Sequence, residues 1–367
     1  MIDFDFERLR SMGLTPALAS QAVLRAETLG NADAACRLMR LSEVHRETVR
    51  LHDGADEHSA RVLPRLQREL TDGESALAVG DWVLAVHDTH GQLWLHDRVP
   101  PQSHLVRRDA DGRRHPVVSN VDTALLVMGL DDDFNPRRLE RFLALVLGSG
   151  LEPIQPVVVL TKADVLADVR TLYDRAQIVR RRVPPGTDVL SVDARDPETA
   201  ARLAPWARFG QTLVLLGSSG AGKSTLTNTL LGADVQDTGA VREHDSRGKH
   251  TTTSRSLHRL PGGACVIDTP GLRALRPDAD EHVVAATFGD VETLALQCRF
   301  RDCRHHDEPG CAVREGVAGD RLRNYHKLLR EARRDTMSAL ERQQQLAMWK
   351  ARGREGRTRL KMKRGEE

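Results

Sequence analysis

The amino-acid sequence predicts a multidomain α/β protein, because three different patterns follow one another along its 367 residues. Short β-like runs separated by glycines fill residues 41–118 and indicate a small barrel. In residues 119–277, continuous apolar strands alternate with helical patterns, which is typical of a parallel sheet buried on both faces. Residues 278–345 are predicted to be helical around a group of cysteines, and a helical extension (1–40) and a basic tail (346–367) flank these regions.

The composition is that of an ordinary globular protein, with 40% hydrophobic residues, 29% charged residues and a net charge of +2. Positive charge gathers between Lys350 and Arg364, where a single glutamate opposes the lysines and arginines. Such a run is either a solvated tail or an arm that binds a polyanion such as RNA. No apolar run approaches the ~20 residues that span a bilayer. The acidic N-terminus lacks the order of a signal peptide, so we expect a cytoplasmic protein without membrane contact.

The predicted elements can be followed in chain order. Leu14, Leu18 and Ala22 have helical spacing ahead of the barrel. The barrel strands are expected near residues 48–51, 76–79, 82–86 and 92–95. An amphipathic helix is expected over residues 136–148. The strands of the parallel sheet are predicted at residues 123–128, 157–160, 188–191, 212–216 and 265–267.

A phosphate-binding loop directly follows the predicted strand at residues 212–216. It matches G-x-x-x-x-G-K-[ST] in full, as Gly217, Ser218, Ser219, Gly220, Ala221, Gly222, Lys223 and Ser224, with Thr225 next. The glycines let main-chain N–H groups surround phosphates, and the start of the next helix favours anions. We expect Lys223 to reach the β- and γ-phosphates and Ser224 to hold Mg²⁺.

A base-reading tetrapeptide lies upstream of this loop, as Thr161, Lys162, Ala163 and Asp164. Asp164 is expected to accept hydrogen bonds from guanine N1 and N2, a donor pair that adenine does not offer. Lys162 would lay its stem along the base, and Ser191 is a candidate for a contact at the base edge. Because the base reader precedes the phosphate loop, the sequence indicates a circularly permuted GTPase. Thr161 stands where the usual tetrapeptide has asparagine, which leaves an ATP-using phosphate-loop protein as an alternative.

The metal-side motif D-x-x-G is present as Asp268 to Gly271. Asp268 is expected to contact Mg²⁺ through water, and the Gly271 amide to sense the γ-phosphate. Either Thr251 or Thr252, in the polar stretch before this motif, is the expected switch ligand.

Leu272 occupies the position where Ras-like enzymes place a water-orienting glutamine. The isolated protein should therefore be slow, on the order of 10⁻⁴ s⁻¹, with a partner supplying acceleration. His250 either positions the water once the loop is ordered or is simply solvated.

Three cysteines and a histidine form a metal-binding pattern, C-x4-C-x-H-x5-C, from Cys298, Cys303, His305 and Cys311. Three thiolates and one imidazole suit one tetrahedral structural zinc ion with no open position for catalysis. In a reducing compartment, crowded cysteines favour metal over disulfides. His306 is the nearby substitute ligand.

Taken together, these residues resemble the RsgA family of GTPases, also called YjeQ, over about residues 40–330. The shared markers are the permuted motif order, the zinc spacing, and short motifs at residues 120–122, 134–136 and 249–253. The resemblance implies an N-terminal OB-fold β-barrel, a central circularly permuted P-loop GTPase and a C-terminal helical zinc-binding domain. It also implies a monomer that binds GTP and GDP with Mg²⁺ and acts in late maturation of the 30S small ribosomal subunit. GTP hydrolysis would then be stimulated by that particle and its 16S rRNA.

Two other functions stay open. One is a nucleotide-regulated RNA-binding or chaperone module in which turnover is incidental, and the other is a permuted GTPase of large-subunit assembly. Arginines of the predicted barrel region are candidates for binding RNA phosphates, namely Arg61, Arg65, Arg68, Arg107, Arg108, Arg113 and Arg114. Since Gly271 leads toward the zinc domain, loss of the γ-phosphate is expected to reorient that domain.

Overall fold

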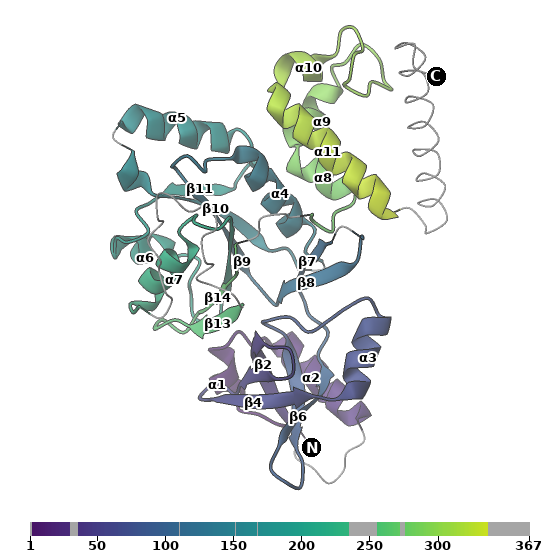
Figure 1. Ribbon diagram of the computed structural model, residues 1–367, viewed down its shortest axis with the longest axis vertical. Helices are drawn as coiled ribbons and strands as arrows, with labels where there is room; N and C mark the ends of the chain where they lie inside the picture. Colours follow the sequence, from purple (N-terminus) through teal and green to yellow (C-terminus); the bar gives the residue numbers. More distant parts are fainter. Residues whose placement is uncertain are drawn as a thin grey trace, which may run out of the picture.

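A computed structural model describes residues 2–29, 36–109, 111–150, 152–166, 168–234, 255–271 and 276–336. Within these ranges it confirms the predicted fold class: a closed barrel, a mostly parallel sheet behind the phosphate loop, and a helical C-terminal part (Figure 1). His250, Thr251, Thr252 and Leu272 lie outside the described residues. The division of the chain at residues 40, 118, 277 and 345 stays a prediction.

The barrel is closed by five strands. They are β2 (Cys36–Val44), β3 (Val49–His52), β4 (Glu57–Val62), β5 (Trp82–His87) and β6 (Leu93–Arg98), with α3 (Pro64–Asp72) between β4 and β5. The order is β2-β3-β4-β6-β5, and β5 pairs back to β2. Only the β4–β6 pair of this ring is parallel. This is the ring of an OB-fold, in which closure removes exposed sheet edges, and fully buried Met39, Leu41, Leu51 and Leu95 fill its interior.

The N-terminal segment packs into the body of the protein. It forms β1 (Ile2–Asp3), α1 (Phe6–Arg10) and α2 (Pro16–Thr28), and β1 pairs with the first barrel strand. Thr15 caps α2 through its hydroxyl, and Pro16 occupies the first helical position, where no N–H is needed. Leu9, Met12 and Leu18 are at most 1% exposed, in a core shared with the barrel and the central sheet.

A buried arginine joins the barrel to the central sheet. Arg40 on β2 is fully buried, and it donates to the Met12 carbonyl, to Thr212 Oγ1 at 2.8 Å and to the Asn120 carbonyl at 2.8 Å. Its guanidinium also lies 5.5 Å from the centroid of the Trp82 ring. Burial lowers the pKa of Arg40, so these acceptors are what stabilise its charge. One side chain thereby fixes the N-terminal segment, the barrel and the sheet relative to one another.

The central sheet has the order β11-β10-β9-β12-β14-β13. Its strands are β9 (Thr123–Gly129), β10 (Gln155–Thr161), β11 (Asp188–Ser191), β12 (Thr212–Gly217), β13 (Ser256–Arg259) and β14 (Cys265–Asp268). All pairs are parallel except β13–β14. Every residue of β9 and β12 is buried, as the continuous apolar runs predict. Figure 1 shows α4 (Pro136–Leu147), α5 (Val169–Arg180), α6 (Glu198–Leu203) and α7 (Lys223–Leu231) around this sheet.

A hairpin and a helical unit complete the described chain. The hairpin pairs β7 (His104–Arg108) with β8 (Arg114–Ser119), and the helical unit holds α8 (Glu281–Thr287), α9 (Gly289–Ala295), α10 (Ala312–Gly316) and α11 (Gly319–Thr336). None of the helices in the described ranges is long and apolar enough to cross a membrane.

The helical unit docks on α4 through a buried carboxylate. Glu140 is fully buried and accepts hydrogen bonds from Arg321 at 2.8 Å, Asn324 at 2.6 Å and Arg182 at 3.2 Å. Arg321 in turn makes two hydrogen bonds to Asp290, at 2.8 and 2.6 Å. Because a buried charge needs such partners, this network specifies how the helical unit sits on the sheet domain.

Candidate nucleotide site and metal centre

The phosphate loop is shaped by glycines at the end of β12 and the start of α7. Gly220 and Gly222 have φ angles of +78° and +90°, in the left-handed region that side chains disfavour. A Cβ on Gly217 would lie 2.3 Å from the carbonyl oxygen of Val127 on the neighbouring strand. The loop therefore needs glycine at these places, which leaves its main chain open toward a ligand.

Lys223 is folded back onto this loop. Its side chain is 6% exposed, and Nζ donates to the carbonyls of Ser218 at 2.9 Å and Gly217 at 3.3 Å. Burial lowers the pKa of Lys223, while the charge of Asp268 raises it. A buried ammonium whose hydrogen bonds go to neutral carbonyls attracts an anion such as a phosphate.

Asp268 and Ser224 meet at the edge of the sheet. Asp268 ends β14, and the Ser224 hydroxyl donates to its Oδ2 at 3.3 Å. The other carboxylate oxygen, Oδ1, is buried without a hydrogen-bond partner in the described part of the chain, and burial raises the pKa of Asp268. A hydroxyl and a carboxylate are the hard oxygen ligands that Mg²⁺ prefers, so the pair fits that ion.

Gly271 of the D-x-x-G motif lies directly against the phosphate loop. A Cβ on Gly271 would come within 2.4 Å of the Ser219 nitrogen. Only glycine allows this approach, and the main chain after β14 is thereby brought to the place where phosphates would sit.

The base-reading tetrapeptide and the phosphate loop touch each other. Thr161 on β10 pairs with Gly129 of β9, and Gly217 on β12 pairs with Val127 of the same strand, so both motifs leave the same edge of the sheet. Thr161 is fully buried, and its Oγ1 donates to the carbonyl oxygen of Ala221 at 2.6 Å. Two motifs that lie far apart in sequence, in reversed order, therefore line one site.

The other predicted base contacts lie around this junction. Lys162 has a left-handed main chain, with φ of 60°, and Asp164 is exposed in the short helix η1 (Ala163–Val165). Ser191 ends β11, in register with Leu160 of β10. The structure thus brings these residues to the same edge of the sheet as the phosphate loop.

Two aspartates of this site were not predicted from the sequence. Asp131 Oδ2 accepts a hydrogen bond from Lys162 Nζ at 2.5 Å, and Asp133 Oδ2 accepts one from the Ser218 hydroxyl at 2.6 Å. Both lie in the loop between β9 and α4. A run of three aspartates just beyond a fully buried strand, at the ligand-binding edge of a parallel sheet, was the signal that could have found them.

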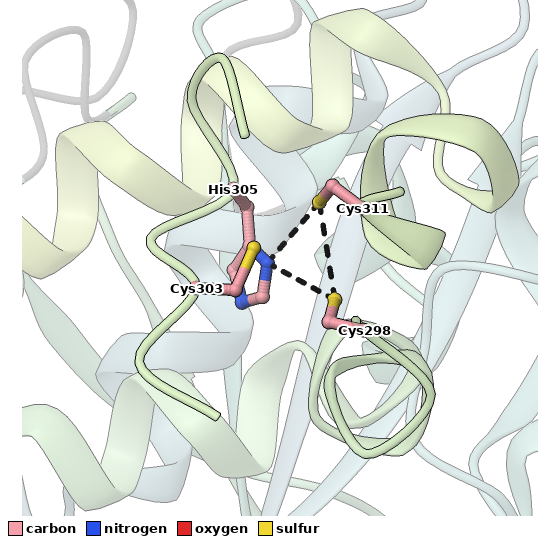
Figure 2. A group of neighbouring side chains, drawn as sticks. All are labelled: Cys298, Cys303, His305 and Cys311. Carbon is pink, nitrogen blue, oxygen red and sulfur yellow. Dashed lines mark hydrogen bonds between the residues drawn. The ribbon is translucent and has the colours of Figure 1, made fainter. Parts of the chain in front are cut away.

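The predicted cysteine and histidine ligands converge at one point of the helical unit (Figure 2). Cys298 follows α9, Cys311 precedes α10, and Cys303 and His305 come from the loop between them. The four ligand atoms lie within 4.8 Å of one another, so the group could hold a metal ion.

The spacing of three of these atoms matches one face of a zinc tetrahedron. Metal–sulfur bonds of about 2.3 Å imply S···S edges of about 3.8 Å and S···N edges of about 3.6 Å. Cys298 Sγ is 3.9 Å from Cys311 Sγ, and His305 Nδ1 lies 3.7 and 3.5 Å from those two sulfurs. His306 instead stacks on His326, with ring centroids 4.2 Å apart, and is not among the four converging residues.

Comparisons with known proteins agree with this architecture. A profile described as RsgA GTPase matches residues 98–277. The small ribosomal subunit biogenesis GTPase RsgA of Xanthomonas campestris pv. campestris is 48% identical over 279 residues, 73% of each chain. The protein of the same name from Xanthomonas oryzae pv. oryzae is 43% identical over 333 residues, 88% of each chain.

Solved structures show a similar fold. The crystal structure of YjeQ from Thermotoga maritima has a TM-score of 0.57 and 23% identity, covering 81% of this chain and 98% of its own. YloQ, described as a circularly permuted GTPase, has a TM-score of 0.54 and 22% identity, covering 84% of this chain and 99% of its own. With the permuted order of the motifs, the OB-like barrel and the curated relatives in agreement, the chain belongs to the RsgA family of GTPases.

Proposed function

We propose that this protein hydrolyses GTP to GDP and phosphate during late maturation of the 30S small ribosomal subunit, and that the 30S particle stimulates the reaction. The assignment of the nucleotide site rests on the 2.6 Å hydrogen bond from Thr161 to Ala221, which joins the base reader to the phosphate loop. The ribosomal role is supported by the similarity to curated proteins named small ribosomal subunit biogenesis GTPase RsgA.

Each predicted residue has a role in this reaction. The main-chain amides from Gly217 to Thr225 and the Lys223 ammonium hold the phosphates, while Asp164 and Ser191 contact the guanine. Ser224 and Asp268 would hold Mg²⁺, which when bound neutralises charge that develops on the phosphates. The Gly271 amide, which lies against the phosphate loop, senses the γ-phosphate.

The attacking water forms a bond to the γ-phosphorus while the bond from that phosphorus to the β–γ bridging oxygen breaks. Thr251 or Thr252 acts as the switch ligand, and His250 orients the water when the 30S particle is bound. Leu272 cannot orient water, so the protein on its own stays slow.

We assign zinc to the cluster of Cys298, Cys303, His305 and Cys311. Three sulfurs and one imidazole nitrogen that converge within 4.8 Å of one another are the donor set that structural zinc prefers. The ion would hold together a loop that otherwise has little apolar core, and it leaves no open position for catalysis.

The segment after D-x-x-G offers a route from the nucleotide to the rest of the protein. Asp278 pairs with Arg108 at 2.6 Å and with Arg114 at 2.8 Å, both on the β7–β8 hairpin. Arg276 pairs with Asp335 on α11. A change at Gly271 therefore reaches the hairpin and the helical unit over a few residues, so loss of the γ-phosphate would reorient both on the ribosome.

Two groups can be distinguished among the arginines proposed for RNA. Arg61, Arg65 and Arg68 are exposed on β4 and α3 and could contact phosphates, although Arg65 also lies 3.6 Å from Glu69. Arg108 and Arg114 already pair with Asp278, so we assign them to internal communication rather than to RNA contact.

The test is GTP hydrolysis with and without purified 30S subunits, for the wild type and for Ser224→Ala. We expect acceleration by 30S and not by 50S subunits, and loss of hydrolysis in Ser224→Ala with 30S binding retained. Equal acceleration by 50S would favour large-subunit assembly, and full maturation activity of Ser224→Ala would favour an RNA-binding module. A GTP-against-ATP competition in the same assay tests guanine preference.

A further inference from the structure

We propose that Asp131 is a positioning residue for nucleotide binding, which holds the Lys162 ammonium so that the stem of Lys162 lies ready along the guanine base. The inference rests on the proposed function, because it names a second residue that shapes the same base site. Asp131 itself is not expected to touch the nucleotide.

The contact between the two side chains is short and partly shielded. Lys162 Nζ lies 2.5 Å from Asp131 Oδ2, and the two side chains are 27% and 28% exposed. Burial raises the pKa of Asp131, but the hydrogen bond and the charge of Lys162 outweigh it, so the net pKa lies below the usual range. Asp131 is therefore a carboxylate at neutral pH, and the contact is a charge-assisted hydrogen bond.

Asp131 is itself held in place by the main chain around it. A Cβ on Gly129 would lie 2.5 Å from Asp131 Oδ1, so glycine at 129 leaves room for this carboxylate. Arg175 donates to the carbonyls of Leu130 and Asp131 at 2.5 and 3.1 Å. The Leu130 nitrogen donates to the Thr161 carbonyl at 2.9 Å, which ties the loop to the base-reading motif. The carboxylate is thus fixed before any nucleotide arrives.

This fixed carboxylate reduces the freedom of a long side chain. A lysine stem has several rotatable bonds, and ordering it on binding costs up to about 2 kcal/mol. A stem already held at its ammonium end loses less entropy when a base packs on it, which raises affinity by preorganisation. Since the base is the same in GTP and GDP and stays remote from the γ-phosphate, the affinity for both nucleotides rises equally. Such uniform binding changes KM and leaves kcat unchanged.

The experiment compares two neighbouring substitutions that remove the same charge. Asp131→Asn removes the negative charge that holds Lys162 and leaves at most a neutral amide oxygen as acceptor. Asp132 is exposed and makes no side-chain hydrogen bond or ion pair within the part of the chain that the structure describes, so Asp132→Asn is its matched control. We expect Asp131→Asn to weaken GTP and GDP binding by about tenfold each and to raise KM equally, with kcat unchanged. Asp132→Asn should bind both nucleotides as the wild type does. Fluorescent nucleotide titration and steady-state hydrolysis give these values.

A double-mutant cycle with Lys162→Met distinguishes positioning from a general structural effect. In the Lys162→Met background, Asp131→Asn should cause no further loss of affinity, and Asp131→Glu in the wild-type background should restore part of it. Wild-type affinity in Asp131→Asn, an additive loss in the cycle, or a fall in kcat at constant affinity would each overturn the inference. Failure of the wild type to bind guanine nucleotides would instead overturn the proposed function.

Discussion

Thr161→Val is expected to weaken nucleotide binding without changing the preference for guanine. Valine keeps the shape of threonine but removes the hydroxyl that donates to the Ala221 carbonyl at 2.6 Å. Because Thr161 is fully buried, water cannot replace that donor, and the carbonyl is left unsatisfied. Such a loss costs about 1–3 kcal/mol, which corresponds to roughly 5- to 150-fold in affinity if it falls entirely on the nucleotide-bound loop.

The assay is a titration with GTP, GDP and ATP of the wild type, Thr161→Val, Thr161→Ser and Asp164→Ala. Thr161→Ser keeps the hydroxyl and should remain close to the wild type. Thr161→Val should lose affinity for all three nucleotides in similar proportion, whereas Asp164→Ala should lose the distinction between GTP and ATP. If Thr161→Val bound as tightly as the wild type, or if it altered the GTP-to-ATP ratio instead, the reasoning that Thr161 joins two loops would be refuted.

Three further predictions follow from the metal cluster, the buried carboxylate and a partly buried histidine, His104. Cys311→Ser should abolish stoichiometric zinc and unfold the surrounding loop, since structural zinc contributes ~10–16 kcal/mol of apparent binding energy; metal analysis and far-UV circular dichroism check this. Glu140→Ala should destabilise the docking of the helical unit by about 3 kcal/mol, because Arg321 and Arg182 lose a fully buried partner but keep Asp290 and Asp320. Hydrogen exchange across α11 measures this loss, and unchanged protection would contradict the prediction. Burial lowers the pKa of His104 from 6.5 to about 4, so stability should be complete above pH 6.5 and fall as the pH drops toward 4. The loss should reach about 2 kcal/mol at pH 5, and urea unfolding of His104→Gln should show a smaller difference between pH 7 and pH 5 than the wild type.

Local chemistry explains why much of the fold and site could be predicted. The buried strands β9 and β12 are continuous apolar runs. The glycines that shape the phosphate loop lie close together in the sequence. The predicted metal ligands lie within 14 residues, from Cys298 to Cys311, so their spacing alone indicated a cluster. Ligands that are close in sequence must be close in space, which makes such patterns informative.

The sequence by itself determined the permuted order of the motifs, the fold class and the identity of the metal-binding residues. The tertiary structure alone decided which distant partners meet: Thr161 with Ala221 across 60 residues, Lys162 with Asp131 across 31, and Arg40 with Thr212 across 172. A motif specifies its chemistry through residues that are neighbours along the chain. The partners that order and connect the motifs depend on how β9, β10 and β12 align, because only the packed sheet brings the ends of these strands to one edge.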